Sequence, residues 1–166
     1  PVLVGVNLMD RDRASFSRTV EVLEKRYGRE VTPLQIPIGE ESGFTGVVDL
    51  LTGKAWTWEG DESGKATEVD VPADVAGQVS SAREALMETV IETDDRLMER
   101  YLEGEEIDES TLSATFRRAV ASGSVVPILC AAGRSAAGVE SLLDALVSIT
   151  PSPVQASSIP SSGISR

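Results

Sequence analysis

The chain has 166 residues, with 27 acidic and 15 basic side chains and a formal net charge of −12. Its hydrophobic fraction of 41% and charged fraction of 25% are those of an ordinary globular protein with a buried core. One cysteine and no histidine exclude an internal disulfide and a cysteine-based metal site, and remove the commonest general base. No apolar run approaches the ~18 residues that span a membrane, and the opening residues do not resemble a signal peptide. We therefore expect a cytoplasmic protein that makes no contact with membranes.

The first predicted element is a buried strand over residues 2–6, which ends at Asn7 with Asp10 three positions later. Open α/β sheets bind their ligands at such strand ends. A carboxylate there can accept two hydrogen bonds from guanine, while the asparagine amide holds the other edge of the base. Asn and Asp also favour an ordinary turn leading into a helix. Spacing alone leaves both interpretations open.

A helix and an edge strand are predicted next. Residues 13–27 have the apolar spacing of a helix, with Asp12 as its cap. Residues 31–39 alternate apolar side chains but contain two prolines, which cannot donate to a β-ladder. We therefore predict an edge strand, or the entry into a strand, for this segment.

Residues 39–71 predict a small antiparallel sheet, with a turn at residues 61–64. Trp56 and Trp58 lie two positions apart on one predicted strand, so they point to the same side. Paired tryptophans commonly cover a core, and here they would pack on the helices that follow. The alternative is that the two rings form an aromatic surface on which a nucleotide base stacks.

The second half predicts three helices and one strand. A long helix ends near Leu102, a second covers residues 110–121, and a third covers residues 138–149. Between the last two, residues 125–130 form an apolar run typical of a buried strand, in which Cys130 is a small apolar side chain. The order predicts an α/β fold, in which two strand–helix units of a parallel sheet are interrupted by an α+β lobe.

The negative charge is concentrated in one segment. Residues 59–109 contain 17 acidic and 4 basic side chains, whereas the rest of the chain contains 10 and 11. Nucleic-acid binding by this lobe is not expected, because phosphate contacts need cations. Five of its acidic residues recur every three or four positions, which places them on one face of a helix. That face is either simply solvated or a docking strip for a basic partner. The five residues are Glu84, Glu88, Glu92, Asp95 and Glu99.

Residues 7–11, Asn-Leu-Met-Asp-Arg, resemble the Asn-Lys-x-Asp guanine-specificity motif of GTPases in the form found in elongation factor G. Other stretches follow in the same order as in that family, and the resemblance extends from residue 4 to about residue 155. These stretches are residues 38–39, 44–50, 97–102 and 151–154.

The resemblance implies the C-terminal half of a P-loop-type GTPase domain, formed by residues 1–38 and 124–154, with residues 39–123 as an inserted acidic lobe. Residues 155–166 are expected to be a flexible tail, whose serine-rich composition is also typical of an appended expression sequence. The sequence contains no Gly-x-x-x-x-Gly-Lys-Ser/Thr phosphate loop, and no Asp-x-x-Gly magnesium loop follows a buried strand. We therefore expect a fragment that hydrolyses no GTP by itself. GTP or GDP, with magnesium, would be the ligands of the parent protein.

The resemblance also assigns the residues of a base pocket. Asn7 and Asp10 select guanine, and Leu8 covers the base at a position where the family has lysine. The backbone N–H of Gly133 donates to the guanine carbonyl. Ala132 replaces a serine whose hydroxyl steadies the aspartate. Because a lost hydrogen bond to a charged group costs roughly 1.5–3 kcal/mol, these departures predict weakened nucleotide binding.

Two functions are therefore expected for this chain. The first is a fragment of an elongation-factor-G-like translational GTPase, which binds GTP and the ribosome and promotes translocation in protein synthesis. In that family the inserted lobe contacts the lysine-bearing ribosomal stalk protein, and the five acidic residues would supply the opposite charge. The alternative is a non-catalytic protein-interaction module with a vestigial nucleotide site and an acidic docking helix.

Overall fold

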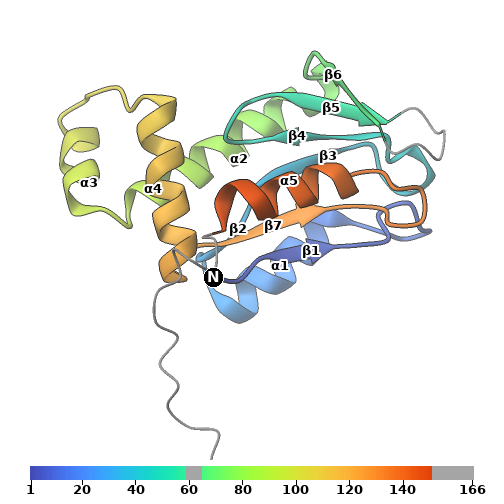
Figure 1. The fold of residues 1–166 in the computed structure, drawn as a ribbon, viewed down its shortest axis with the longest axis horizontal. Helices are drawn as coiled ribbons and strands as arrows, with labels where there is room; N and C mark the ends of the chain where they lie inside the picture. Colours follow the sequence, from blue (N-terminus) through green and yellow to red (C-terminus); the bar gives the residue numbers. More distant parts are fainter. Residues whose placement is uncertain (59–64, 151–166) are drawn as a thin grey trace, which may run out of the picture.

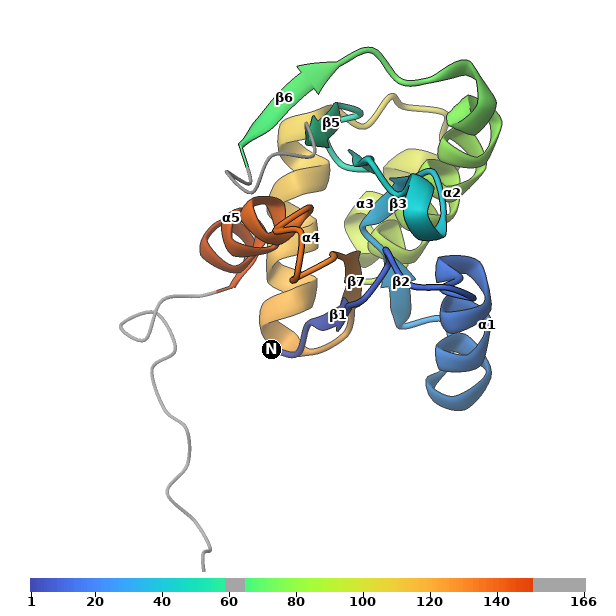
Figure 2. The same ribbon diagram turned by 90° about the vertical axis from the view of Figure 1, so that its right-hand side faces the viewer.

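A computed structural model describes residues 1–58 and 65–150 of the chain. Two β-sheets form the middle of the molecule. Helices α1 (Phe16–Tyr27) and α2 (Ala73–Ile91) lie on one side of them, and α4 (Glu109–Ser122) and α5 (Val139–Ile149) lie on the other (Figures 1 and 2). The protein therefore has a mixed α/β fold. The turn expected at residues 61–64 and the tail expected at residues 155–166 lie outside the described residues.

The first sheet is parallel and has three strands in the order β1-β7-β2. They are β1 (Val4–Val6), β7 (Val126–Cys130) and β2 (Val31–Pro33). Val6 is in register with Cys130, so β1 and β7 end at the same edge. The sequence predicted β1 and β7 as strands of one parallel sheet, and it did not assign the strand predicted at residues 31–39 to that sheet.

The second sheet is antiparallel, with four strands in the order β3-β4-β5-β6. A short 3₁₀ helix, Glu41–Gly43, precedes β4. The strands are β3 (Gln35–Ile38), β4 (Gly46–Asp49), β5 (Ala55–Trp58) and β6 (Ala66–Val69).

The sequence predicted a single strand over residues 31–39, but the structure has two strands there, β2 and β3. The segment changes sheets at Leu34, whose N–H donates to the carbonyl of Ile128 in the parallel sheet at 2.9 Å. The Leu34 carbonyl accepts from the N–H of Leu50 beside the antiparallel sheet at 2.9 Å. The antiparallel sheet thus begins at Gln35, four residues before the boundary expected at residue 39. The prediction of edge strands is confirmed, because β2 and β3 are both terminal strands of their sheets.

The helix predicted over residues 13–27 begins later, at Phe16, and the prediction of Asp12 as its cap is wrong. Ser15 is the N-cap, and its side chain accepts a hydrogen bond from the N–H of Arg18. Arg13 has a φ of +64°, which a right-handed helix does not allow. The residues before Ser15 therefore form a turn and not the first turn of the helix. Gly28 ends the helix.

The long helix predicted to end near Leu102 is in fact two helices, α2 and α3 (Asp95–Leu102). Asp94 causes the break, because its carboxylate accepts from the N–H groups of Arg96 and Leu97 and thereby caps a new helix. The helix predicted at residues 110–121 is α4, and it stops at Gly123. Within the described residues, no helix is both long and apolar enough to cross a membrane.

Candidate functional site

The loops that follow β1 and β7 meet at one edge of the parallel sheet. The N–H of Ala131 donates to the carbonyl of Val6 at 2.9 Å, and the N–H of Met9 donates to the carbonyl of Ala131 at 3.2 Å. The side chain of Met9 is almost completely buried and anchors the first loop in the core. Two segments more than 120 residues apart therefore form a single polar surface, as parallel strands with a common carboxyl edge require.

Asn7 holds the two loops together. Its Oδ1 accepts the N–H of Gly133 at 2.9 Å and the N–H of Leu8 at 2.7 Å. These two bonds orient the amide group, because Oδ1 must be the acceptor. The Nδ2 donors of Asn7 make no hydrogen bond with the described residues, so they are available to a ligand.

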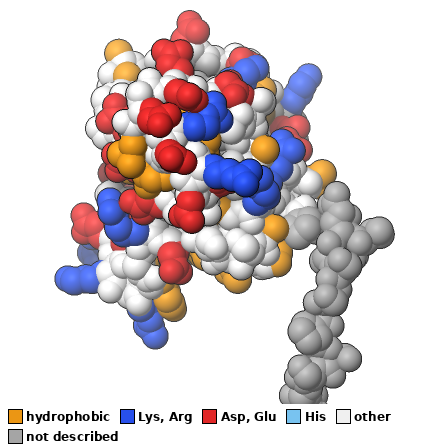
Figure 3. Space-filling view, turned by 90° about the vertical axis from the view of Figure 1, so that its left-hand side faces the viewer, with side chains coloured by type: hydrophobic (Ala, Val, Ile, Leu, Met, Phe, Trp, Pro, Cys, Tyr) orange, Lys and Arg blue, Asp and Glu red, His pale blue; other side chains and the backbone are white. Residues whose placement is uncertain are grey.

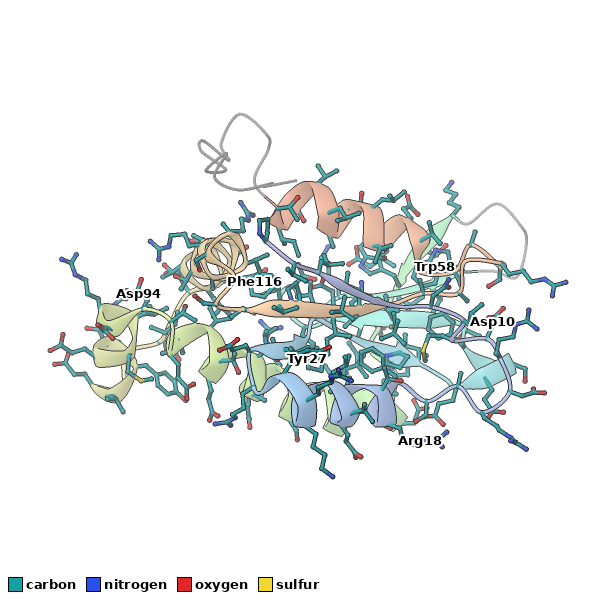
Figure 4. All side chains as sticks on the ribbon, turned by 90° about the horizontal axis from the view of Figure 1, so that it is seen from below. Asp10, Arg18, Tyr27, Trp58, Asp94 and Phe116 are labelled. Atoms are coloured by element: carbon teal, nitrogen blue, oxygen red, sulfur yellow. The ribbon has the colours of Figure 1, made fainter. Side chains whose placement is uncertain are left out.

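Asp10 lies in the same loop, at the right-hand end of the molecule in Figure 4. Its Oδ1 atom is buried and has no hydrogen-bond partner among the described residues. A buried acceptor without a partner is rare in folded proteins and calls for an explanation. A ligand that presents N–H donors, as the edge of guanine does, would satisfy this oxygen.

Leu8 projects from the loop between these two residues. Its φ is +64°, in the left-handed region that side chains with a Cβ seldom adopt. The side chain is 49% exposed although it is apolar. This position allows Leu8 to cover a planar ligand by apolar contact, without the charge that the family's lysine would supply.

The N–H of Gly133, which is predicted to donate to the guanine carbonyl, donates to Oδ1 of Asn7 in the structure. The bond to guanine stays a prediction, and it would compete with this contact. A Cβ added at Gly133 would lie 3.3 Å from Oδ1 of Asn7, so the two residues are in tight contact. Ala132 is completely buried, and its N–H donates to the carbonyl of Ala137 at 2.8 Å. The N–H groups of Ala132 and Gly133 are therefore both engaged within the protein.

The five acidic residues predicted as a docking strip do not share one helix. Glu84 and Glu88 are on α2, Glu92 is its C-cap, and Asp95 and Glu99 are on α3. All five are exposed. Figure 3 looks at the end of the molecule formed by α3 and α4, where acidic side chains are interspersed with basic ones. The helix break and this mixture of charges weaken the prediction of a continuous acidic strip on a single rigid helix.

The two candidate regions are far apart. Asp10 lies at one end of the molecule and Asp94, which caps α3, lies at the other (Figure 4). Among residues 1–58 and 65–150, no three His, Cys, Asp or Glu side chains are close enough together to hold a metal ion.

Sequence reasoning missed Gln35, which is 2% exposed and lines a cavity on the far face of the antiparallel sheet. The sequence did contain a signal for Gln35, because it is the single amide side chain among the otherwise apolar residues from Leu34 to Ile38. The two tryptophans share a face of β5, as expected. Trp58 is buried, and Trp56 lines the same cavity as Gln35.

No family model matches the chain. Among solved structures, the crystal structure of a protein from Thermus thermophilus is similar, with a TM-score of 0.82 and 32% sequence identity over 93% of this chain. The chain spans 23% of the length of that protein. The same fold therefore occurs as one part of a much longer polypeptide.

Proposed function

We propose that this chain is part of an elongation-factor-G-like translational GTPase, namely the C-terminal half of its P-loop-type GTP-binding domain with an inserted α+β lobe. The observation that carries the proposal is the buried Oδ1 of Asp10, which has no partner among the described residues and lies at the edge where β1 and β7 end. Nδ2 of Asn7, in the same loop, is an available donor. Together they offer an acceptor and a donor to a guanine base.

The sheet topology supports the proposal. The first loop follows β1 and the second follows β7, and the two strands are parallel neighbours. This is the arrangement in which open α/β sheets bind nucleotides. The proposed parent would bind GTP or GDP with magnesium through a phosphate loop that this sequence lacks. It would act on the ribosome in the cytoplasm, with the five acidic residues facing the stalk protein.

Two observations favour the alternative, a non-catalytic interaction module with a vestigial nucleotide site. The N–H of Gly133 is engaged by Asn7, and Leu8 supplies no charge to a bound nucleotide. Guanine binding would then require the Gly133–Asn7 bond to open, or would proceed without a donor to the base carbonyl.

Nucleotide titration of the natural full-length protein tests the proposal. Calorimetry with GDP, and with ADP as the control, should show a clear preference for GDP. Asp10→Asn places a donor against the N–H donors of guanine, at roughly 1–3 kcal/mol per unsatisfied group. GDP affinity should therefore fall by roughly 5- to 150-fold. Xanthosine diphosphate, which has a carbonyl in place of the guanine amino group, should bind this variant better than GDP.

A second comparison distinguishes a weakened site from a vestigial one. Leu8→Lys should tighten GDP binding if the pocket still receives the nucleotide. If the wild type and Leu8→Lys both fail to bind GDP, the site is vestigial and the interaction module is the better proposal. Equal GDP affinity in the wild type and in Asp10→Asn would mean that Asp10 does not touch the base.

A further inference from the structure

The cavity that Gln35 and Trp56 line lies away from the strand-end loops. It has a volume of about 400 Å³ and is enclosed by one face of the antiparallel sheet together with helices α4 and α5. Figure 2 shows these two helices on the side of the sheets opposite α1 and α2. The volume of the cavity is within the range of ~300–1,000 Å³ that is typical of small-ligand sites. None of the residues assigned to guanine recognition lines it.

Gln35 supplies a side-chain amide to the wall of this cavity. Its Oε1 accepts the N–H of Cys130 at 3.3 Å, and this bond fixes which side of the amide is the acceptor. Nε2 is therefore the donor side of the amide, and it is not one of the buried atoms that lack a partner among the described residues. A ligand that carries a hydrogen-bond acceptor, such as a carbonyl oxygen, suits this donor.

An aromatic face lies on the same side of the sheet. Trp56 lines the cavity, and Nζ of Lys54 is 6.0 Å from the centroid of its ring. A cation within about 6 Å of an indole face is attracted by the ring. The ring thus already attracts one cation, and it offers apolar surface to the stem of a long side chain.

The charge of the walls is negative. Glu109 on α4 and Asp144 on α5 are exposed and form no ion pair among the described residues. Of the two cations that line the cavity, Lys54 is already paired with Glu68 at 3.0 Å. Arg117 donates to the hydroxyl of Ser113, at 3.5 Å. The lining contains four carboxylates and two cations, which are Asp49, Glu109, Glu140, Asp144, Lys54 and Arg117.

We propose that this cavity binds a basic peptide segment, taking up a lysine or arginine side chain together with an adjacent backbone carbonyl. The carbonyl accepts from Nε2 of Gln35, the aliphatic stem lies against Trp56, and the charged end is held by Asp144 and Glu109. This surface is independent of the proposed guanine site, and neither proposal requires the other.

A titration followed by NMR tests the proposal on the chain itself. The probe is the capped tripeptide acetyl-Ala-Lys-Ala-amide, and the control probe has norleucine in place of lysine, which keeps the stem and removes the charge. The sequence contains only three glutamines and one asparagine, so the side-chain amide signal of Gln35 can be assigned among few others. The lysine probe should shift that signal and the indole signal of Trp56 in a saturable way.

Two variants locate the charge contact. Asp144→Asn and Glu109→Gln should each weaken binding of the lysine probe several-fold and leave binding of the norleucine probe unchanged. Glu103→Gln, an exposed acidic position that does not line the cavity, is the matched control and should have no effect. The proposal is wrong if the Gln35 amide shows no saturable shift, or if both probes bind equally. It is also wrong if a glutamate-containing probe binds more tightly than the lysine probe.

Discussion

Asn7 has two separable roles, and substitutions can distinguish them. Its Oδ1 accepts two backbone N–H groups, one from Leu8 and one from Gly133, whereas its Nδ2 makes no bond with the described residues. Asn7→Ala removes both the acceptor and the donor. Asn7→Asp keeps an oxygen acceptor, removes the donor and adds a negative charge. The first variant should therefore destabilise the fold, and the second should affect only a ligand.

The size of the effect follows from the two bonds. Each contributes about 0.5–1.5 kcal/mol, and both are exposed to water, so Asn7→Ala should cost about 1–2 kcal/mol. For a protein of this size, that loss lowers Tm by about 2–8 °C. Asn7→Asp should remain within about 0.5 kcal/mol of the wild type at pH 7, because hydrogen bonds to a carboxylate are stronger than those to an amide oxygen.

Urea unfolding followed by circular dichroism measures both variants, and hydrogen exchange of the Gly133 amide reports on the bond directly. In Asn7→Ala that amide should exchange faster, and in Asn7→Asp it should exchange at the wild-type rate. If Asn7→Asp loses as much stability as Asn7→Ala, the two acceptor bonds do not hold the loops together and the reasoning fails.

Four further predictions concern acidic residues. Asp94→Ala removes the cap of α3 and should lower the free energy of unfolding by about 1 kcal/mol in urea titrations; an unchanged midpoint would show that the break between the helices does not depend on this cap. The hydroxyl of Ser110 and the hydroxyl and N–H of Thr111 lower the pKa of Asp108, so its stabilisation is present above pH ~4 and is lost as the pH falls further. The Tm difference between the wild type and Asp108→Asn should therefore shrink between pH 7 and pH 3. Reversing Glu88 and Glu92 to lysine should leave the circular dichroism spectrum unchanged and slow association with a lysine-rich stalk domain several-fold in low salt; equal rates at every salt concentration would identify a merely solvated face. Asp10→Ala should leave the urea midpoint unchanged or raise it, because it removes an unpaired buried oxygen, and a large loss of stability would contradict this.

The parts of the fold that were predictable are those whose signals are local. Gly28 and Gly123 end their helices with φ values of +88° and +83°, which glycine adopts without strain. The buried strand at residues 126–130 followed from an apolar run alone. By contrast, Leu34 lies inside an apolar run with no internal signal, and only its long-range partners Ile128 and Leu50 place the change of sheets there. Pairing between distant strands is not encoded in any short window of sequence.

The sequence contained a local signal for the break between α2 and α3, the capping residue Asp94, but the helical spacing of the apolar residues on both sides favoured one continuous helix. Leu86, Val90 and Leu97 continue one apolar stripe across it, which favours a single helix. Asp94 opposes this with a capping side chain, and the cap prevails. For the candidate site, the pairing of the two loops was predicted from the family resemblance, but the engagement of the Gly133 N–H by Asn7 depends on atomic positions that the sequence does not specify.

Other aspartates of the same chain show why Asp10 is unusual. Asp49 occupies a turn, and its Oδ1 accepts the N–H groups of Leu51 and Thr52 at 3.0 and 2.8 Å. Asp94 and Asp108 cap helices in the same self-satisfying way. A turn-forming role for Asp10 would predict a similar local partner, yet its buried Oδ1 has none among the described residues. Local turn chemistry therefore explains these three aspartates but not the buried Oδ1 of Asp10, which a ligand that donates hydrogen bonds would satisfy.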